Sequence, residues 1–421
     1  MDPRPARHDI ALLFAARGVR MFGYGLLAVV LVLYLDAIGL SGGQIGLLLA
    51  LTLLGDVVIS LWLTTHADRL GRRRVLVVGA MLLLAAGLVF AATPVFVVLL
   101  VAATLGVISP SGNEVGPFLA VEQAALAQLA PPSRRTHLFA RYQVAGSVAT
   151  AVGALAAGLI VAWVAQRLAD PTDAYRAVIV GYALVGIVLA VLFWRVSPAV
   201  EVPPAEIHDE TVQTRLGLHQ SQRVVLRLSA LFALDAFAGG FVMTSFIAFW
   251  FSQQYGVDPA LLGAILFGAN ILAAVSALAA APLAARFGLV RTMVFTHLPS
   301  NVLLILVPLM PTLPLAAFVL LVRFSISQMD VPTRQSYTMA IVEPDERTAA
   351  AGVTGIARSL GVAASPLIAA PLLVGSAFTG APFVIGGALK IVYDLLLYRS
   401  FRTLRPPEER SEVQEGQDGA P

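Results

Sequence analysis

The sequence predicts an all-α integral membrane protein in which twelve transmembrane helices form two pseudo-symmetric six-helix bundles. Composition is the first reason, because 58% of the 421 residues are hydrophobic and only 13% are charged, whereas soluble domains carry about a quarter charged residues. The second reason is the length of the apolar stretches, since a helix needs about 20 residues to cross a bilayer. The third is a repeat that divides the chain into similar halves.

The repeat places similar residues about 212 positions apart. The first copy reads Glu122, Gln123, Pro132, Arg135 and Thr136, and the second reads Arg334, Gln335, Pro344, Arg347 and Thr348. Four of these pairs are identical, and the remaining pair replaces an acid by a base. Two other stretches repeat at nearly the same offset, namely Leu13–Ala15 with Leu231–Ala233, and Arg69, Gly71 and Arg74 with Arg286, Gly288 and Arg291. The first of these alignments sets Arg17 opposite Asp235.

Clusters of proline, glycine and charge divide the apolar sequence into the twelve spans. We expect the first six near residues 10–35, 44–65, 75–93, 96–129, 137–166 and 175–196. We expect the other six near residues 223–253, 259–284, 292–311, 313–342, 349–374 and 379–400. Proline chemistry predicts tight turns at Thr93 and Pro94 and from Pro311 to Pro314.

The longest polar segment inside the chain separates the two sets of spans. We therefore expect an N-terminal bundle at 1–198, a cytoplasmic linker at 199–222 and a C-terminal bundle at 223–405. Residues 406–421 lack apolar periodicity and are predicted to form a disordered cytoplasmic tail. The N-terminal segment has no small-residue cleavage site, so the first span is predicted to be a retained helix.

The distribution of arginine predicts the orientation in the membrane. When the loops are assigned alternately to the two sides, most arginines fall on one side, and the other side receives little beyond Arg167 and Arg176. The positive-inside rule then places both termini in the cytoplasm. The net charge of +3 therefore reflects topology, and no nucleic-acid partner is expected. Lys390 is the only lysine, a bias typical of a high-GC bacterium, so we expect a bacterial cytoplasmic (inner) membrane.

The loop between the second and third spans carries a motif known from a transporter family. It contains Asp68, Arg69, Gly71, Arg72 and Arg73. With six plus six spans and a long central loop, the chain from about residue 10 to 400 resembles the major facilitator superfamily of secondary transporters. The glycine and proline cluster typical of antiporters in the fifth span is only hinted at by three glycines, without a proline: Gly146, Gly153 and Gly158.

The resemblance implies two bundles that rock about a central site lined by spans one, four, seven and ten. Most intramembrane charges fall on these four spans: Arg17, Arg20, Glu114, Glu122, Asp235, Arg323, Asp330 and Arg334. A charge facing lipid near mid-bilayer costs roughly 2.5 to 3.5 kcal/mol on insertion scales. We therefore expect these side chains to face protein or water.

Four of the charges are predicted to lie at one level, about two turns from the cytoplasmic ends of their helices. We hypothesise a cytoplasmic gate in which Arg17 pairs with Glu122, and Asp235 pairs with Arg334. The pairs would exchange partners across the interface when the cavity closes. The alternative is that both pairs only hold helices together within each half.

A deeper polar set is suited to holding a solute: Arg20, Tyr24, Asn113, Glu114, Asn270, Arg323, Gln328 and Asp330. Arg20 and Arg323 could clamp an organic anion, and Glu114 or Asp330 could carry a coupling proton. The alternative is that Arg20 neutralises Glu114 and Arg323 neutralises Asp330. In that case a neutral or cationic amphiphile is as plausible a cargo as an anion.

Other polar residues receive structural predictions. Asp56 in the second span is expected to pair with Arg141. Asp68 is expected to form a latch, either with Arg135 or at the helix start near Thr348. Three histidines lack metal-ligand spacing and are expected to be solvated residues near span ends: His66, His137 and His297.

No enzymatic activity is expected from the motifs present. The sequence has no phosphate-binding glycine loop followed by Gly-Lys, no HExxH and no serine nucleophile elbow. No cysteine is present, which excludes disulfides and thiolate metal sites. Neither a cofactor nor a metal is expected.

The expected function is that of a secondary active transporter in the lipid bilayer. It would move a small organic solute by alternating access, coupled to a proton, and would act as a monomer. The lack of a nucleotide-binding motif favours a gradient as the energy source. A drug or amphiphile efflux antiporter is the alternative. A non-transporting membrane sensor is a different class, and a channel is a weaker third option.

Overall fold

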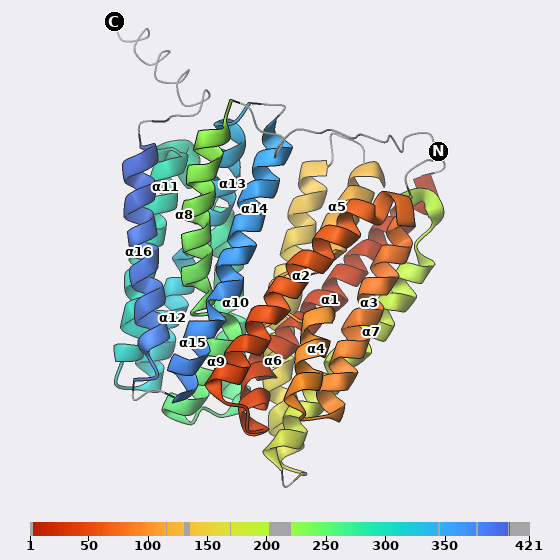
Figure 1. Ribbon diagram of the computed structural model, residues 1–421, viewed down its shortest axis with the longest axis vertical. Helices are drawn as coiled ribbons and strands as arrows, with labels where there is room; N and C mark the ends of the chain where they lie inside the picture. The colour runs from red at the N-terminus through yellow and green to blue at the C-terminus, as the bar shows by residue number, and fades with distance from the viewer. Residues whose placement is uncertain are drawn as a thin grey trace, which may run out of the picture. The chain divides into compact units, whose positions relative to one another are not determined.

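The computed structural model describes residues 3–114, 116–129, 135–168, 170–201, 220–343, 346–375, 378–402 and 404, and these ranges are helical without any strand (Figure 1). The first half contains α1 (Pro3–Ala37), α2 (Gly42–Leu70), α3 (Arg72–Ala92), α4 (Phe96–Leu105), α5 (Phe118–Leu129), α6 (Arg135–Ala165) and α7 (Pro171–Arg195). The short helix η2 (Pro198–Val200) follows.

The second half contains α8 (Gln222–Gly240), α9 (Thr244–Tyr255), α10 (Pro259–Phe287), α11 (Leu289–Leu306), η5 (Val307–Leu309), α12 (Leu313–Ile326), α13 (Asp330–Ala340), α14 (Arg347–Ala364), α15 (Pro366–Gly375) and α16 (Ala381–Phe401). Over the described ranges, 11 helical segments are long and apolar enough to cross a membrane. The two shorter apolar helices α4 and α5 together cover the predicted fourth span. The twelve-span fold is confirmed.

Four predicted spans are broken helices. The fourth span is interrupted between Leu105 and Phe118, the seventh at 241–243, the tenth at 327–329 and the eleventh at Ser365. In the fourth span the cause is visible in the sequence, because the segment contains two prolines and three glycines, two of them at positive φ (Gly112 at 70° and Gly116 at 82°). Non-helical backbone at membrane depth occurs where protein or a water-filled cavity satisfies it.

Two glycines that are equivalent in the repeat form the same kind of turn between helices in the two halves. Gly71 ends α2 and starts α3 with φ +96°, and Gly288 links α10 to α11 with φ +84°. A side chain is strained at such angles, whereas glycine adopts them freely. This agreement supports the alignment of the two halves at this turn.

The helices form two compact units. Unit 1 contains Met1–Asp209, Val242–Ile271 and Pro366–Thr379, and unit 2 contains Glu210–Phe241, Leu272–Ser365 and Gly380–Pro421. Unit 1 thus includes two segments from the second half of the sequence. The predicted boundaries of the two bundles follow the sequence halves and stay a prediction.

Small residues allow the second-half segments to pack closely inside unit 1. A Cβ atom on Gly42 of α2 would lie 2.9 Å from the carbonyl oxygen of Ala370 in α15. One on Gly158 of α6 would meet the carbonyl oxygen of Pro259 at the start of α10. The hydroxyl of Thr244, at the start of α9, donates to the carbonyl of Ser111 at 2.8 Å. Close approach of this kind is the usual function of small residues between membrane helices.

Candidate functional site

Arg20 of α1 lies at the centre of a group of buried, paired charges in unit 1. Its two terminal nitrogens donate to the two carboxylate oxygens of Glu122 at 2.6 and 2.7 Å, and its Nε donates to Glu114 at 2.8 Å. The ring of Phe118 lies beneath the guanidinium, 4.6 Å from ring centroid to Cζ. Two-point arginine–carboxylate contacts are among the strongest polar interactions in proteins.

Arg17 lies one helical turn earlier and binds the other oxygen of Glu114 at 2.6 Å. Its remaining nitrogens donate to the carbonyl of Tyr142 and the side chain of Gln143 in α6, each at 2.9 Å. Gly146 makes room for this guanidinium, because a Cβ there would lie 2.6 Å from its Nε. The hydroxyl of Tyr142 in turn donates to Glu122.

We call Arg17, Arg20, Glu114 and Glu122 the unit 1 network. The predicted pairing of Arg17 with Glu122 was wrong, because Arg20 takes both oxygens of Glu122 and Arg17 binds Glu114. The reason is the break in the fourth span, which places Glu114 in non-helical chain where its two oxygens reach both arginines. With two arginines and two glutamates the network carries no net charge. The expected neutralisation of Glu114 by Arg20 is present.

A second network lies in unit 2 and centres on Asp235 of α8. Its carboxylate binds Arg334 at 3.2 Å, Arg358 at 3.2 Å and Lys390 at 2.6 Å. Arg334 also binds Asp330 at 3.0 Å. The expected ion pair between Asp235 and Arg334 is therefore present. We call these five residues the unit 2 network.

Arg358 and Lys390 belong to this network, although the sequence pattern singled out neither as a site residue. Lys390 is the sole lysine of the chain and lies inside an apolar span, and that placement was the available signal. Charged residues within transmembrane segments are rare and usually functional.

Arg323 of α12 differs from the other buried arginines. Only 8% of its surface is exposed, and its Nε has no hydrogen-bond partner. Its guanidinium lies 4.8 Å from the ring centroid of Phe324. Among the described residues it forms no ion pair within 4 Å, although the charge of Asp330, which binds Arg334, acts on it electrostatically. The expected pairing of Arg323 with Asp330 was wrong.

The remaining residues of the predicted solute site are dispersed. Tyr24 is fully buried in α1, whereas Asn113 is exposed in the break of the fourth span. The amide of Asn270 donates to Leu266 one turn earlier on α10, in the part of that helix that belongs to unit 1. The backbone of Gln328 in unit 2 donates to the hydroxyl of Ser276 at 3.2 Å. These contacts leave the assignment of the four residues to a solute site a prediction.

The prediction of a solvated His297 was wrong. The imidazole is 4% exposed on α11 and contacts Asp394 of α16, with 2.8 Å between Nδ1 and Oδ1. Asn301 donates to the other oxygen of Asp394 at 2.9 Å. Asp394 was not predicted either, although an acid within an apolar span was visible in the sequence. By contrast, His66 is partly exposed, and the side chain of His137 is outside the described set.

The motif loop joins α2 to α3 in unit 1. The carboxylate of Glu201 accepts hydrogen bonds from the backbone nitrogens of Arg72 and Arg73 at 2.7 and 3.1 Å, so it caps the N-terminus of α3. The buried Arg72 side chain also binds Gln128 at 2.8 Å. Arg69 is exposed. The motif therefore organises this end of unit 1, and Glu201, from the predicted linker, was a missed participant.

The latch expected at Asp68 is not tested by the structure. The side chains of Asp68, Arg135 and Thr348 all lie outside the described set. The nearby prediction for Asp56 was wrong, because its carboxylate accepts a hydrogen bond from the backbone nitrogen of Gly116 at 2.6 Å and Arg141 is exposed.

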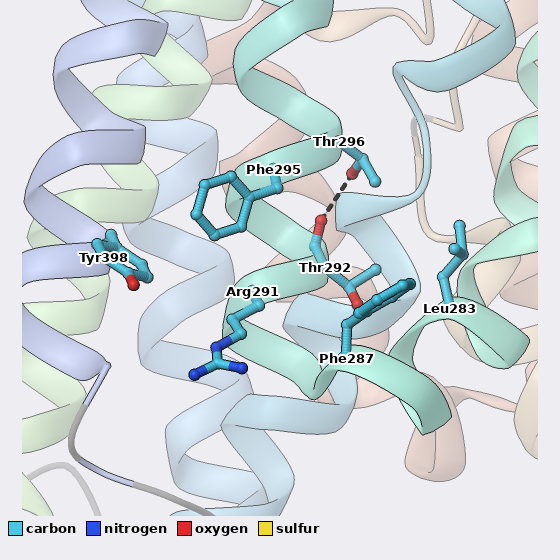
Figure 2. Close-up of a pocket in the computed structure, with 7 residues that line it drawn as sticks. All are labelled: Leu283, Phe287, Arg291, Thr292, Phe295, Thr296 and Tyr398. Carbon is cyan, nitrogen blue, oxygen red and sulfur yellow. Dashed lines mark hydrogen bonds between the residues drawn. The ribbon is translucent and has the colours of Figure 1, made fainter.

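A cavity of about 520 Å³ in unit 2 is separate from both networks. It is lined by Leu283, Phe287, Arg291, Thr292, Phe295, Thr296 and Tyr398 (Figure 2). Figure 2 shows Phe295 and Tyr398 projecting from neighbouring helices, with Arg291 one turn from Phe295 on α11. None of the predicted solute-site residues lines it. The described part of the chain contains no group of three or more His, Asp or Glu side chains placed to hold a metal ion.

Comparisons with known proteins agree with this architecture. A model of the Major Facilitator Superfamily matches residues 13–366 and 228–421. The uncharacterized membrane protein YJR124C of Saccharomyces cerevisiae is 33% identical over 420 residues, covering 93% of this chain and 94% of that protein. The quinolone resistance protein NorA of Staphylococcus aureus is 30% identical over 117 residues, which is 28% of this chain and 29% of NorA.

Solved transporter structures share the fold. A bacterial homolog of the human lysosomal transporter Spinster, inward-facing and unoccupied, has a TM-score of 0.72 at 16% identity and covers 95% of this chain and 98% of its own. A D-xylose–proton symporter has a TM-score of 0.70 at 16% identity, with coverage of 92% and 97%. The chain belongs to the major facilitator superfamily, a family of membrane transporters.

Proposed function

We propose that this protein is a proton-coupled secondary transporter that moves a small organic solute across a bacterial cytoplasmic membrane by alternating access. The main support is that buried, paired charges lie on or beside the broken helices of a major facilitator fold. In secondary transporters, discontinuous helices form the solute and ion sites. The similarity to a proton symporter supports proton coupling.

Arg323 is the proposed anchor of the solute. A buried donor without a partner costs about 1 to 3 kcal/mol, and a solute with a carboxylate, phosphate or carbonyl oxygen would recover that cost on binding. Arg20 cannot take part as predicted, because all of its nitrogens serve Glu114 and Glu122. The revised solute site therefore contains one available arginine.

The gate remains part of the proposal in a modified form. Each network closes within its own unit, as expected for contacts that hold helices together. Gating requires Glu122 and Arg334 to exchange partners when the units move. In the single variants Glu122→Arg and Arg334→Glu transport should be lost, and the double variant should recover it if the two residues pair directly. A double variant as inactive as the single variants would assign both networks a purely structural role.

Efflux of a cationic amphiphile is the second candidate function. The neutral unit 1 network and the partial similarity to the quinolone resistance protein NorA favour it. A non-transporting sensor is the third candidate. Solute-dependent thermal stabilisation of the purified monomer, followed by tracer uptake into proteoliposomes at several pH values, tests the alternatives. Saturable, pH-driven uptake of anions supports the main proposal, whereas extrusion of ethidium supports efflux and the lack of any saturable flux supports a sensor.

The proposed topology places both termini in the cytoplasm. Its support is the bias of arginine toward one set of loops, together with an even number of spans. Reporter fusions at each end test it, since an extracytoplasmic signal from either terminus would overturn the orientation.

A further inference from the structure

Unit 2 contains a buried imidazole–carboxylate pair that the solute and gate sites do not use. We propose that the pair formed by His297 and Asp394 is the site that binds the coupled proton. This inference rests on the proposed proton-coupled function and identifies the residues that perform the coupling. They replace Glu114 and Asp330, which were predicted for this task.

The geometry determines which ring nitrogen receives the proton. Nδ1 of His297 lies 2.8 Å from Oδ1 of Asp394, and an ionised carboxylate can only accept a hydrogen bond. Nδ1 also lies 3.2 Å from the amide nitrogen of Asn301. With Asp394 ionised, the neutral imidazole carries its hydrogen on Nδ1, and the lone pair on Nε2 takes the proton. Binding forms one N–H bond at Nε2, breaks no bond within the protein and leaves an imidazolium beside Asp394. Of all side chains, histidine most readily changes charge between pH 5 and 8.

The hydrogen bonds of Asp394 leave its carboxylate able to stabilise an imidazolium at His297. Its second oxygen accepts a hydrogen bond from Asn301 at 2.9 Å, and the carboxylate is fully buried. The edge of Tyr393 packs against the imidazole, with 6.0 Å between ring centroids. No arginine binds Asp394 among the described residues, so the carboxylate is available to an imidazolium.

The other buried acids are less suited to this task. Glu114, Glu122, Asp235 and Asp330 each bind at least one arginine. Protonating any of them would leave a buried guanidinium without its full countercharge, which is strongly unfavourable. Asp9 and Asp56 are competitors, because neither binds an arginine among the described residues: Asp9 accepts hydrogen bonds from Ser197, and Asp56 accepts them from Gly116 and Ser60. Asp56 provides a matched control.

The His297–Asp394 pair interacts electrostatically with the unit 2 network. Three ionisable groups interact electrostatically with the pair: Asp235 of α8 with His297, and Lys390 and Tyr393 of α16 with Asp394. Arg334 of α13 and Arg358 of α14 are linked to the pair through Asp235, and Asp330 is linked through Arg334. Lys390 precedes Asp394 by one helical turn and binds Asp235 at 2.6 Å. With His297 neutral, Asp235, Asp330 and Asp394 balance Arg334, Arg358 and Lys390.

A proton on His297 disturbs this balance. The added charge repels Lys390 and competes for Asp235, which already serves three cations. Asp235 and Arg334 lie on α8 and α13, parts of two of the broken helices. Proton binding on α11 and α16 is thereby transmitted to helices that are expected to line the solute cleft.

The proton site can be tested without a solute. The chain contains six histidines, so ¹⁵N-histidine labelling in phosphatidylcholine nanodiscs gives a small set of ring signals, and the signal missing from His297→Gln identifies His297. The sample is acidified from about pH 8 to pH 5, the interval in which histidine side chains in general change charge. We expect the ring signals to report proton uptake by His297, and Asp394→Asn to weaken that uptake about tenfold. A His297 ring that stays in one protonation state over this range overturns the proposal.

A distance measurement then separates coupling from a structural role. Since the chain has no cysteine, spin labels can be introduced through Leu70→Cys in unit 1 and Phe287→Cys in unit 2, both exposed. We expect the distance distribution to shift with pH, and both His297→Gln and Asp394→Asn to remove that shift, while the controls His66→Gln and Asp56→Asn retain it.

The outcomes discriminate clearly. A pH response that survives in folded His297→Gln, or one that disappears in Asp56→Asn, overturns the proposal. If His297→Gln does not fold, two measurements test the proposal: the distance shift in Asp394→Asn, and the protonation of the His297 ring in the unsubstituted protein. Failure of pH-driven uptake in every solute assay would instead refute the proposed transport function, since neither measurement here uses a solute.

Discussion

Arg20 holds Glu122 with both terminal nitrogens of its guanidinium, at 2.6 and 2.7 Å, and neither side chain is accessible to solvent. The pair joins α1 to α5, on the C-terminal side of the break that contains Glu114. Planar two-point contact of this kind is specific to arginine, because a lysine ammonium is a point charge on a flexible stem. This relationship leads to the first prediction.

Arg20→Lys should destabilise unit 1 despite the conserved charge. Glu114 would keep Arg17 and Glu122 would keep Tyr142, but a lysine cannot replace all three hydrogen bonds that Arg20 donates to them, at a cost of about 1 to 3 kcal/mol. The melting temperature of the purified protein, followed by intrinsic fluorescence, measures the effect. The control is Arg176→Lys, whose pair with Asp173 is partly exposed and should change stability by less than about 1 kcal/mol. If both substitutions lowered the melting temperature equally, the two-point pair between Arg20 and Glu122 would contribute no more to stability than an exposed ion pair.

Gly146→Ala should displace the guanidinium of Arg17. The new methyl group would lie 2.6 Å from Nε of Arg17, a distance that forces the side chain or α6 to move. Overpacking of this size costs about 1 to 3 kcal/mol, and transport should fall with stability. Gly181→Ala on α7 is the matched control, because nothing lies within 4 Å of its added Cβ. A neutral result at Gly146 would show that Arg17 tolerates displacement.

Asp235→Asn should be rescued in part by a second substitution. The single change leaves Arg334, Arg358 and Lys390 around an uncharged side chain, and a broken buried pair costs about 3 to 5 kcal/mol. Adding Lys390→Met removes one of the excess cations and should restore more than half of the lost stability. Adding Arg399→Gln, at an exposed position on the same helix, should restore none. Thermal denaturation of the three variants provides the comparison, and equal rescue by both second changes would refute a local charge network.

Arg323→Met should separate stability from transport. Replacing a buried guanidinium whose Nε is unpaired by an apolar side chain should leave the melting temperature unchanged or raise it, because functional sites often cost stability. Solute uptake should be lost. Arg227→Gln, at an exposed position on α8, should alter neither property. A large loss of stability in Arg323→Met would indicate a structural role for Arg323.

The sequence predicted those features that local pattern and repetition encode. Apolar length predicted the twelve spans, and the repeat predicted that Gly71 and Gly288 occupy equivalent turns, which both adopt positive φ. The shared depth of opposite charges near the cytoplasmic helix ends also correctly paired Asp235 with Arg334. In each case the information lies in nearby residues or in a constant offset between halves.

The unpredicted features depend on tertiary geometry. Arg17 and Arg20 lie on one face of α1, and which one binds Glu122 depends on the interruption between Leu105 and Phe118. His297 and Asp394 are far apart in the chain, and neither belongs to the stretches that repeat between the two halves. No sequence spacing encodes that contact. Composition alone also gave no indication that Val242–Ile271 would pack within unit 1.

The central claim is that buried charges in this fold serve the movement of a solute by alternating access. Trans-stimulated uptake by purified protein in proteoliposomes tests it most directly, using radiolabelled solutes that raise the melting temperature. We predict saturable uptake that internal unlabelled solute accelerates and that Arg323→Met abolishes. Flux that rises linearly with concentration and does not respond to internal solute would contradict the account and indicate a pore.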